Sequence, residues 1–213
     1  MSPGDGQGPV YLAMAAVWAY WLGVLFMAIR ARLKGAASAG LVPKQAIEKI
    51  MWIVWVPVIT GWILFPWLSV SRDGAAWQIP KFFLEDPLLL NLRWLAALMT
   101  VICLGATIYC WRWMGRNWRV GVTPDEQTEL ITGGPFRHVR HPIYSVSMLM
   151  MVCTLFAVPI WPLLVASMLH IILMNLKARN EETWMAQAHG QAYTDYRKQA
   201  GRFFPKLGPA SSV

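Results

Sequence analysis

A stretch of mixed polar chemistry lies at residues 133–145, which read GGPFRHVRHPIYS. Two arginines and two histidines lie within the five residues 137–141, and Pro142 and Tyr144 follow. Proline suits the first turn of a helix, where unpaired backbone N–H groups favour an anion such as a carboxylate. Arg140 has the planar fork that binds a carboxylate through two hydrogen bonds, and Phe136 and Tyr144 could stack on a flat ring. These residue types predict a site for an anionic, ring-containing ligand.

A second polar group, KARNEE, follows the next apolar stretch at residues 177–182. Glu181 or Glu182 could accept hydrogen bonds from ribose hydroxyls or from an ammonium group. His170, inside the apolar stretch, is more simply a buried, hydrogen-bonded histidine, although ionisable groups within membrane segments are functional suspects. Both polar groups also have a plainer explanation, as basic residues at a membrane edge and acidic residues on a solvated helix face.

Apolar runs predict five membrane-crossing helices that position these groups. The runs are residues 10–29, 50–70 and 88–111, and a hairpin within residues 142–176 that contains no Asp, Glu, Lys or Arg. Because VPIWP at residues 158–162 breaks the hairpin, we expect two helices of about 17 residues, each roughly 25 Å long and short of a ~30 Å hydrocarbon core. A hairpin returns both its ends to one side, so the two polar groups should lie close together.

Composition favours an all-α integral membrane protein. The 213 residues are 56% hydrophobic and only 14% charged, whereas a soluble domain has about 25% charged residues. The length suits one domain. We therefore expect a single membrane domain over residues 1–213, with three spans in 1–111, a ligand-binding half in 112–205 and a disordered tail in 206–213.

The net charge of +8 can indicate nucleic-acid binding. Here the lysines and arginines lie in short loops beside apolar runs, so we expect membrane lipids as partners and no nucleic acid. The three cysteines show no metal-ligand spacing, and we expect no metal.

Basic residues in the short loops predict the orientation of the spans. They are frequent in residues 30–49, in 112–140 and in the C-terminal segment, and absent from the N-terminal segment and from 158–162. We therefore expect the N-terminus outside and the C-terminus in the cytoplasm, across the inner membrane if the source is bacterial. Beyond Lys177, we expect the last span to continue as a cytoplasmic amphipathic helix that is interrupted near Gly190.

The order of motifs between residues 115 and 205 resembles one family of membrane enzymes. It runs Gly-Pro-Phe-Arg-x-Val-Arg-His-Pro-x-Tyr, then a charge-free hairpin, a glutamate pair, Gly190, two tyrosines and RFFP. This order is similar to that of the isoprenylcysteine carboxyl methyltransferase-like group, whose broader kin include phospholipid N-methyltransferases. The resemblance implies methyl transfer from S-adenosyl-L-methionine, bound at the cytoplasmic face of the hairpin. The first two spans match only as generic membrane helices.

The resemblance also implies site residues by position. With the Arg140 clamp included, the expected cofactor-binding residues are Thr128, Glu129, Leu130, Ile131, Phe136, Arg140, His141, Pro142, Ile143, Tyr144 and Glu181. Phe136 stands where the family usually has tyrosine. The aromatic ring for stacking is kept, and the hydroxyl is lost. Lys177 matches an arginine near the substrate, and Arg179 could substitute for it. Since arginine and lysine recognise carboxylates differently, the resemblance does not carry over the identity of the substrate. Val146 replaces a frequent glycine, which loosens the packing expected at the start of the fourth span.

Two other functions stay open on the sequence. Sterol-type membrane reductases resemble this hairpin architecture and bind NADPH, and Arg112, Arg116 and Arg119 would suit its 2′-phosphate. The spacing of His-Pro-x-Tyr and Glu-Glu favours the methyltransferases. A non-catalytic assembly factor or transporter is the other alternative, although charge-free span centres argue against proton coupling.

The expected acceptor is a lipophilic small molecule or lipid that enters from the bilayer and carries a carboxylate, an amine or a thiol. A carboxylate needs no base, whereas an amine or thiol must first lose a proton. For that step His141, Tyr144 and His170 are the nearby candidates, and none is assigned as the base.

Overall fold

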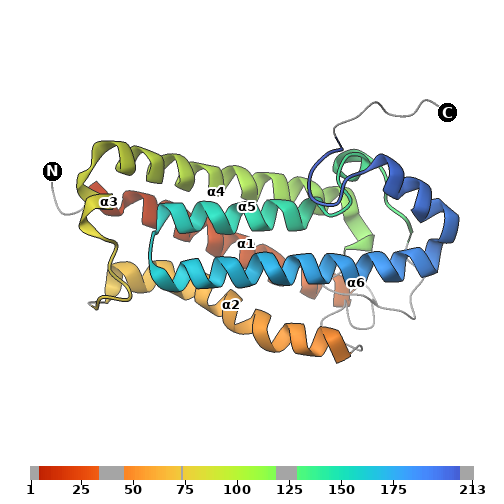
Figure 1. The fold of residues 1–213 in the computed structure, drawn as a ribbon, viewed down its shortest axis with the longest axis horizontal. Helices are drawn as coiled ribbons and strands as arrows, with labels where there is room; N and C mark the ends of the chain where they lie inside the picture. Colours follow the sequence, from red (N-terminus) through yellow and green to blue (C-terminus); the bar gives the residue numbers. More distant parts are fainter. Residues whose placement is uncertain (1–4, 34–45, 73, 119–128, 207–213) are drawn as a thin grey trace.

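The computed structural model describes residues 5–33, 46–72, 74–118 and 129–206. Within these ranges, long helices lie side by side along one axis (Figure 1): α1 (Gly8–Leu33), α2 (Ala46–Ser71), α4 (Pro87–Met114), α5 (Pro142–Ala157) and α6 (Trp161–Gln199). A short helix, α3 (Lys81–Glu85), which the sequence did not predict, precedes α4. The all-α prediction is confirmed, while the predicted tail lies outside the described residues except for Lys206.

Four helices, α1, α2, α4 and α6, are long and apolar enough to cross a membrane by length and composition. The outer surfaces of the bundle carry exposed side chains such as Leu22, Phe26, Ile53 and Ile102, which suits contact with lipid. The chain is therefore an integral membrane protein. α5 has 16 residues and is about 24 Å long, less than a ~30 Å hydrocarbon core, as the break after it predicted.

Helix α5 packs mainly against α4 on one side and α6 on the other. Small or polar side chains such as Ala97, Thr100 and Thr154 are fully buried between these helices, which lets their backbones approach closely. Trp62 of α2 reaches into the same core and donates from Nε1 to Thr154 Oγ1 at 3.1 Å. The core therefore holds α5 in a defined place between α4 and α6.

Arg93 of α4 fixes the end of α5 that faces away from the polar groups. Its guanidinium is buried, and it donates from Nε to the Ala157 carbonyl at 3.0 Å and from Nη1 to the Phe83 carbonyl at 3.3 Å. Cations suit helix C-termini, where backbone carbonyls lack partners. Arg93 therefore caps α5 just before the turn at residues 158–160, which we call the turn end of the bundle.

The opposite end, which we call the site end, is where α6 extends past the other helices (Figure 1). At Gly190 the backbone takes φ 53° and ψ −122°, a conformation that glycine adopts without the usual steric cost. The last turns of α6 therefore fold back over residues 129–140 (Figure 1). The predicted interruption near Gly190 is confirmed.

Labelling at the two ends tests whether the bundle spans a membrane in the predicted orientation. In a background with the three cysteines replaced by alanine, Pro159→Cys should react with a membrane-impermeant maleimide added outside intact cells. Lys206→Cys should react only after permeabilisation, because it lies at the site end. Reaction of both positions from the same side would contradict the prediction that the hairpin crosses the membrane. Reaction of Lys206→Cys from outside and of Pro159→Cys only after permeabilisation would show the opposite orientation.

Candidate functional site

The α5–α6 hairpin brings its two flanking polar groups into contact, as predicted. The Tyr144 hydroxyl donates to Glu181 Oε1 at 2.5 Å. His141 Nδ1 lies 3.5 Å from Glu181 Oε2. The His141 and Tyr144 rings stack with their centroids 5.4 Å apart and their planes 5° apart. Glu181 thus lies against the first turn of α5, which also offers unpaired backbone N–H groups.

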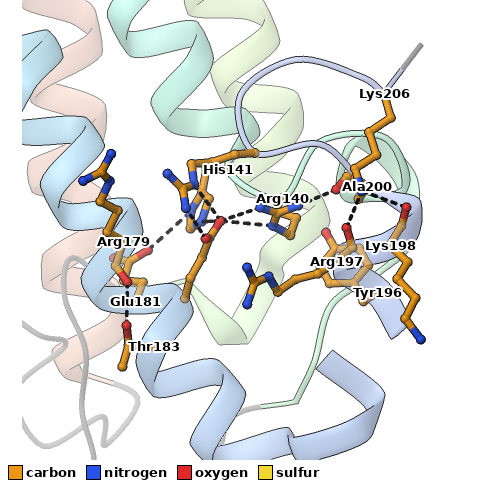
Figure 2. Close-up of polar contacts among 12 residues, drawn as sticks. Arg140, His141, Arg179, Glu181, Thr183, Tyr196, Arg197, Lys198, Ala200 and Lys206 are labelled. Atoms are coloured by element: carbon orange, nitrogen blue, oxygen red, sulfur yellow. Dashed lines mark hydrogen bonds and ion pairs between the residues drawn. The ribbon is translucent and has the colours of Figure 1, made fainter. Parts of the chain in front are cut away.

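Glu182, one helical step further on, is the centre of a buried ionic cluster, and Figure 2 shows two of its members, Arg140 and His141. Arg140 donates to Glu182 Oε1 from Nε at 3.0 Å and from Nη2 at 2.8 Å. Arg202 donates to the same oxygen at 3.0 Å and to Oε2 at 2.6 Å. His141 Nε2 lies 3.4 Å from Oε1. The Glu182 side chain is only 5% exposed, so protein cations supply its charge compensation.

This cluster changes the part expected of Arg140. The sequence suggested that its guanidinium clamps a ligand carboxylate, whereas its fork is held by Glu182 and its Nη1 donates to the Ala200 carbonyl. The pKa of Arg202 is raised, chiefly because its guanidinium donates to Glu182. Arg140 still lines the cavity described below, but its main contacts are with the protein.

The segment after α6 is held against the entry to α5 by backbone hydrogen bonds. The Arg140 N–H donates to the Gly201 carbonyl at 2.8 Å, and the Gly201 N–H donates to the His138 carbonyl at 3.0 Å. A Cβ at Gly201 would lie 1.8 Å from the Phe204 carbonyl oxygen, so only glycine fits there. The Ser145 hydroxyl of α5 donates to the Phe203 carbonyl at 2.8 Å. The RFFP motif therefore fixes the geometry of the His-Pro-x-Tyr motif.

A cavity of about 230 Å³ begins at this polar wall and extends into the bundle. Most of the residues predicted from the sequence line it: Glu129, Leu130, Ile131, Phe136, Arg140, His141, Pro142, Ile143, Tyr144, Lys177 and Glu181. Thr128 lies outside the described residues. Arg179 is exposed, is not among the lining residues, and extends away from the Arg140 contacts (Figure 2). The structure thus brings one predicted substrate residue, Lys177, to the cavity and leaves the other outside.

Lys177 lines the cavity, and its ammonium lies near two aromatic rings of the wall. Its Nζ is 4.9 Å from the ring centroid of Trp55 and 5.8 Å from that of Tyr144, distances at which an ammonium is attracted by an aromatic face. Met174 and Glu181 lie on the same face of α6, because residues three and four apart align along a helix. This face therefore changes from apolar to cationic to acidic toward the site end.

Sequence reasoning missed the aromatic walls of the cavity. Tyr196 donates from its hydroxyl to the Phe136 carbonyl at 2.6 Å and so positions the predicted stacking residue. The other missed wall residues are Tyr20, Trp21, Trp55, Trp111, Trp118, Trp184 and Tyr193. The spacing of the two C-terminal tyrosines after the glutamate pair was a usable signal. Apolar spacing alone does not separate tryptophans that face a cavity from those that face lipid.

The two adjacent glutamates should differ in their effect on stability. Glu182→Gln leaves the buried Arg140 guanidinium without its counter-charge, which should cost on the order of 3 kcal/mol of stability. Glu181→Gln, at a side chain that is 21% exposed, should cost much less. Melting of both variants in detergent is the measurement. Equal melting temperatures for wild type and Glu182→Gln would show that the cluster does not hold the site together.

Comparison with known proteins relates the part of the chain that forms this site to a protein family. Residues 92–192 match the family model described as phospholipid methyltransferase. No curated protein sequence matches the chain. The matched segment covers most of α4, all of α5 and α6 up to just past the bend at Gly190, and so includes both polar groups that flank the hairpin. Residues 92–192 therefore belong to the phospholipid methyltransferase family, within the isoprenylcysteine carboxyl methyltransferase-like group of membrane methyltransferases.

Proposed function

We propose that this protein is an S-adenosyl-L-methionine-dependent methyltransferase that acts on a lipophilic acceptor at the cytoplasmic face of a membrane. The observation that supports this best is one continuous cavity with two kinds of wall. Its site end has a carboxylate, stacked rings and the first turn of a helix, and its membrane half is mainly aromatic. A polar donor and a lipophilic acceptor could therefore meet without leaving the protein.

The residues at the site end fit the parts of the donor. Glu181 has four lone-pair positions, and its partners within the described part of the chain are Tyr144 and His141, so it can also accept hydrogen bonds from ribose hydroxyls. Phe136 offers an aromatic face for a base. The unpaired N–H groups at the start of α5 suit a carboxylate. When bound, S-adenosyl-L-methionine would supply a methyl group on an electrophilic sulfonium.

The chain's own task in such a reaction is positioning. An in-line displacement requires that the acceptor atom, the methyl carbon and the sulfur be collinear, and holding reactants in place lowers the barrier substantially. The aromatic walls exclude water, and Lys177, which lines the cavity, can hold an anionic group of the acceptor. His141 and Tyr144 are engaged with Glu181, so we assign no general base.

The reductase alternative has less support. Of the three arginines that would suit the 2′-phosphate of NADPH, Arg112 is exposed and does not line the cavity. The side chains of Arg116 and Arg119 lie outside the described part of the chain. The phospholipid methyltransferase match over residues 92–192 also favours methyl transfer.

Calorimetric titration tests donor binding directly. Wild-type protein should bind S-adenosylhomocysteine and not NADPH. Glu181→Ala should weaken that binding by about 1–3 kcal/mol, because a hydrogen-bonding group of the ligand loses its partner. Arg179→Ala, at an exposed position outside the cavity, is the matched control and should bind as the wild type does. Unchanged affinity in Glu181→Ala would remove Glu181 from the donor site, and binding of NADPH alone would favour the reductase.

A double-mutant cycle tests whether the two sides of the hairpin hold one ligand. If His141 and Glu181 both contact the donor, His141→Ala and Glu181→Ala should each weaken binding, and the double variant should lose less than their sum by roughly 0.5–3 kcal/mol. Melting of all four proteins in detergent controls for misfolding. Strict additivity, or normal donor binding by His141→Ala, would mean that the polar residues at the entry to α5 are only basic residues at a membrane edge and do not bind the donor.

A further inference from the structure

The membrane half of the cavity reaches a buried chain of three hydrogen-bonding side chains that the proposed donor site does not use. Ser147 Oγ of α5 lies 2.9 Å from His170 Nε2 of α6. The Tyr20 side chain of α1 interacts with the Ser147 side chain. Tyr20 and Ser147 line the cavity, whereas the fully buried His170 lies behind them. Side chains from three helices thus form one polar group in a cavity wall that is otherwise mainly aromatic.

The surroundings of His170 determine which member of this hydrogen-bonding chain donates and which accepts. Its Nδ1 is buried and has no hydrogen-bond partner among the described residues, and its ring packs against Trp62 with centroids 5.1 Å apart. A neutral imidazole has one N–H donor and one acceptor nitrogen. A proton on Nδ1 would leave a buried N–H unpaired, whereas a proton on Nε2 leaves only a lone pair, and orphaned buried N–H groups are the rarer case.

With the proton on Nε2, His170 donates to Ser147 Oγ, which leaves the Ser147 hydroxyl proton to point toward the neighbouring Tyr20 oxygen. Which ring nitrogen of a histidine carries the proton is set by the hydrogen bond that the other ring nitrogen makes. The Tyr20 hydroxyl then keeps its own proton for a partner in the cavity that its ring lines. Tyr20 is therefore the terminal donor of the chain.

Two indoles of the same wall also lack acceptors. Trp21 and Trp55 line the cavity, and the buried Nε1 of each has no hydrogen-bond partner among the described residues. Indole nitrogen can only donate. Trp21 packs edge-on against Tyr20, with centroids 5.2 Å apart. These two rings therefore add no hydrogen-bond acceptor to the wall beside Tyr20, which complements a ligand that carries an accepting oxygen.

We propose that Tyr20 is a specificity-determining residue that donates a hydrogen bond to an oxygen of the methyl acceptor. Ser147 and His170 are positioning residues that orient its hydroxyl. The inference rests on the proposed function, because it places the acceptor in the membrane half of the cavity. The acceptor is then a lipophilic molecule with an uncharged accepting oxygen, such as that of a ketone, an ester or an ether, in addition to the atom that is methylated.

Binding of two matched probes tests the role of Tyr20. The probes are a long-chain methyl ketone and the alkene in which a CH2 group replaces the carbonyl oxygen, each brominated on its chain so that it quenches tryptophan fluorescence. The compared quantity is the ratio of ketone affinity to alkene affinity, relative to the wild type, since the probes partition differently into detergent. Loss of one hydrogen bond in Tyr20→Phe should lower the ratio about three- to tenfold.

Matched variants separate this role from a structural one. Tyr109→Phe removes a hydroxyl at an exposed position of α4 and should leave the ratio unchanged. His170→Gln retains an N–H donor for Ser147 and should keep most of the preference, whereas His170→Leu should lose it. An unchanged ratio in Tyr20→Phe would overturn the inference.

The outcome is independent of the donor site. If S-adenosylhomocysteine binds and the ratio does not change in Tyr20→Phe, the acceptor inference fails alone. If S-adenosylhomocysteine does not bind but the ratio falls, the proposed function fails, and the Tyr20 site stands as a binding site for a lipophilic oxygen compound.

Discussion

The geometry of the site depends on one buried carboxylate, that of Glu182. It is shared by Arg140, which precedes α5, and Arg202, which follows α6. A buried charge is costly unless its partners are held in place, so the two guanidiniums must stay where they are. The chain on either side of the hairpin is thereby fixed to α6. Because His141 comes directly after Arg140, the position of the stacked His141 and Tyr144 rings follows from the same constraint.

The two adjacent glutamates divide two tasks by helix geometry. Neighbouring residues of a helix differ by about 100° in direction. Glu182 therefore faces the loop segments and their arginines, while Glu181 faces the cavity. Burial adds to the difference, because Glu182 is almost fully enclosed and Glu181 is partly open to the cavity. A rigid ionic anchor thus lies next to a carboxylate that has capacity left for a ligand.

The extent to which this arrangement follows from the sequence differs between its parts. The spans were predictable because a chain in lipid must satisfy its backbone groups within helices, and the hairpin followed from the break at residues 158–162. The contact between the Tyr144 and Glu181 segments followed from that hairpin. The roles of Glu182 and Arg202 did not, since they depend on where a loop and the segment after α6 fold back. Nor did the cavity walls, because Trp21 and Trp55 have the same apolar spacing as tryptophans that face lipid.

The long separation along the chain between partners at the site has a consequence for biosynthesis. Arg140 and its acceptor Ala200 are 60 residues apart, a length that is translated in roughly 3–12 s at the usual rates of about 5–20 residues per second. During that interval the entry to α5 has been synthesised, while the carbonyls and the Arg202 guanidinium that complete it have not. The site can therefore be completed only after the whole hairpin has been synthesised, and a chain that ends before residue 202 lacks one of the two guanidiniums that hold the entry to the cavity.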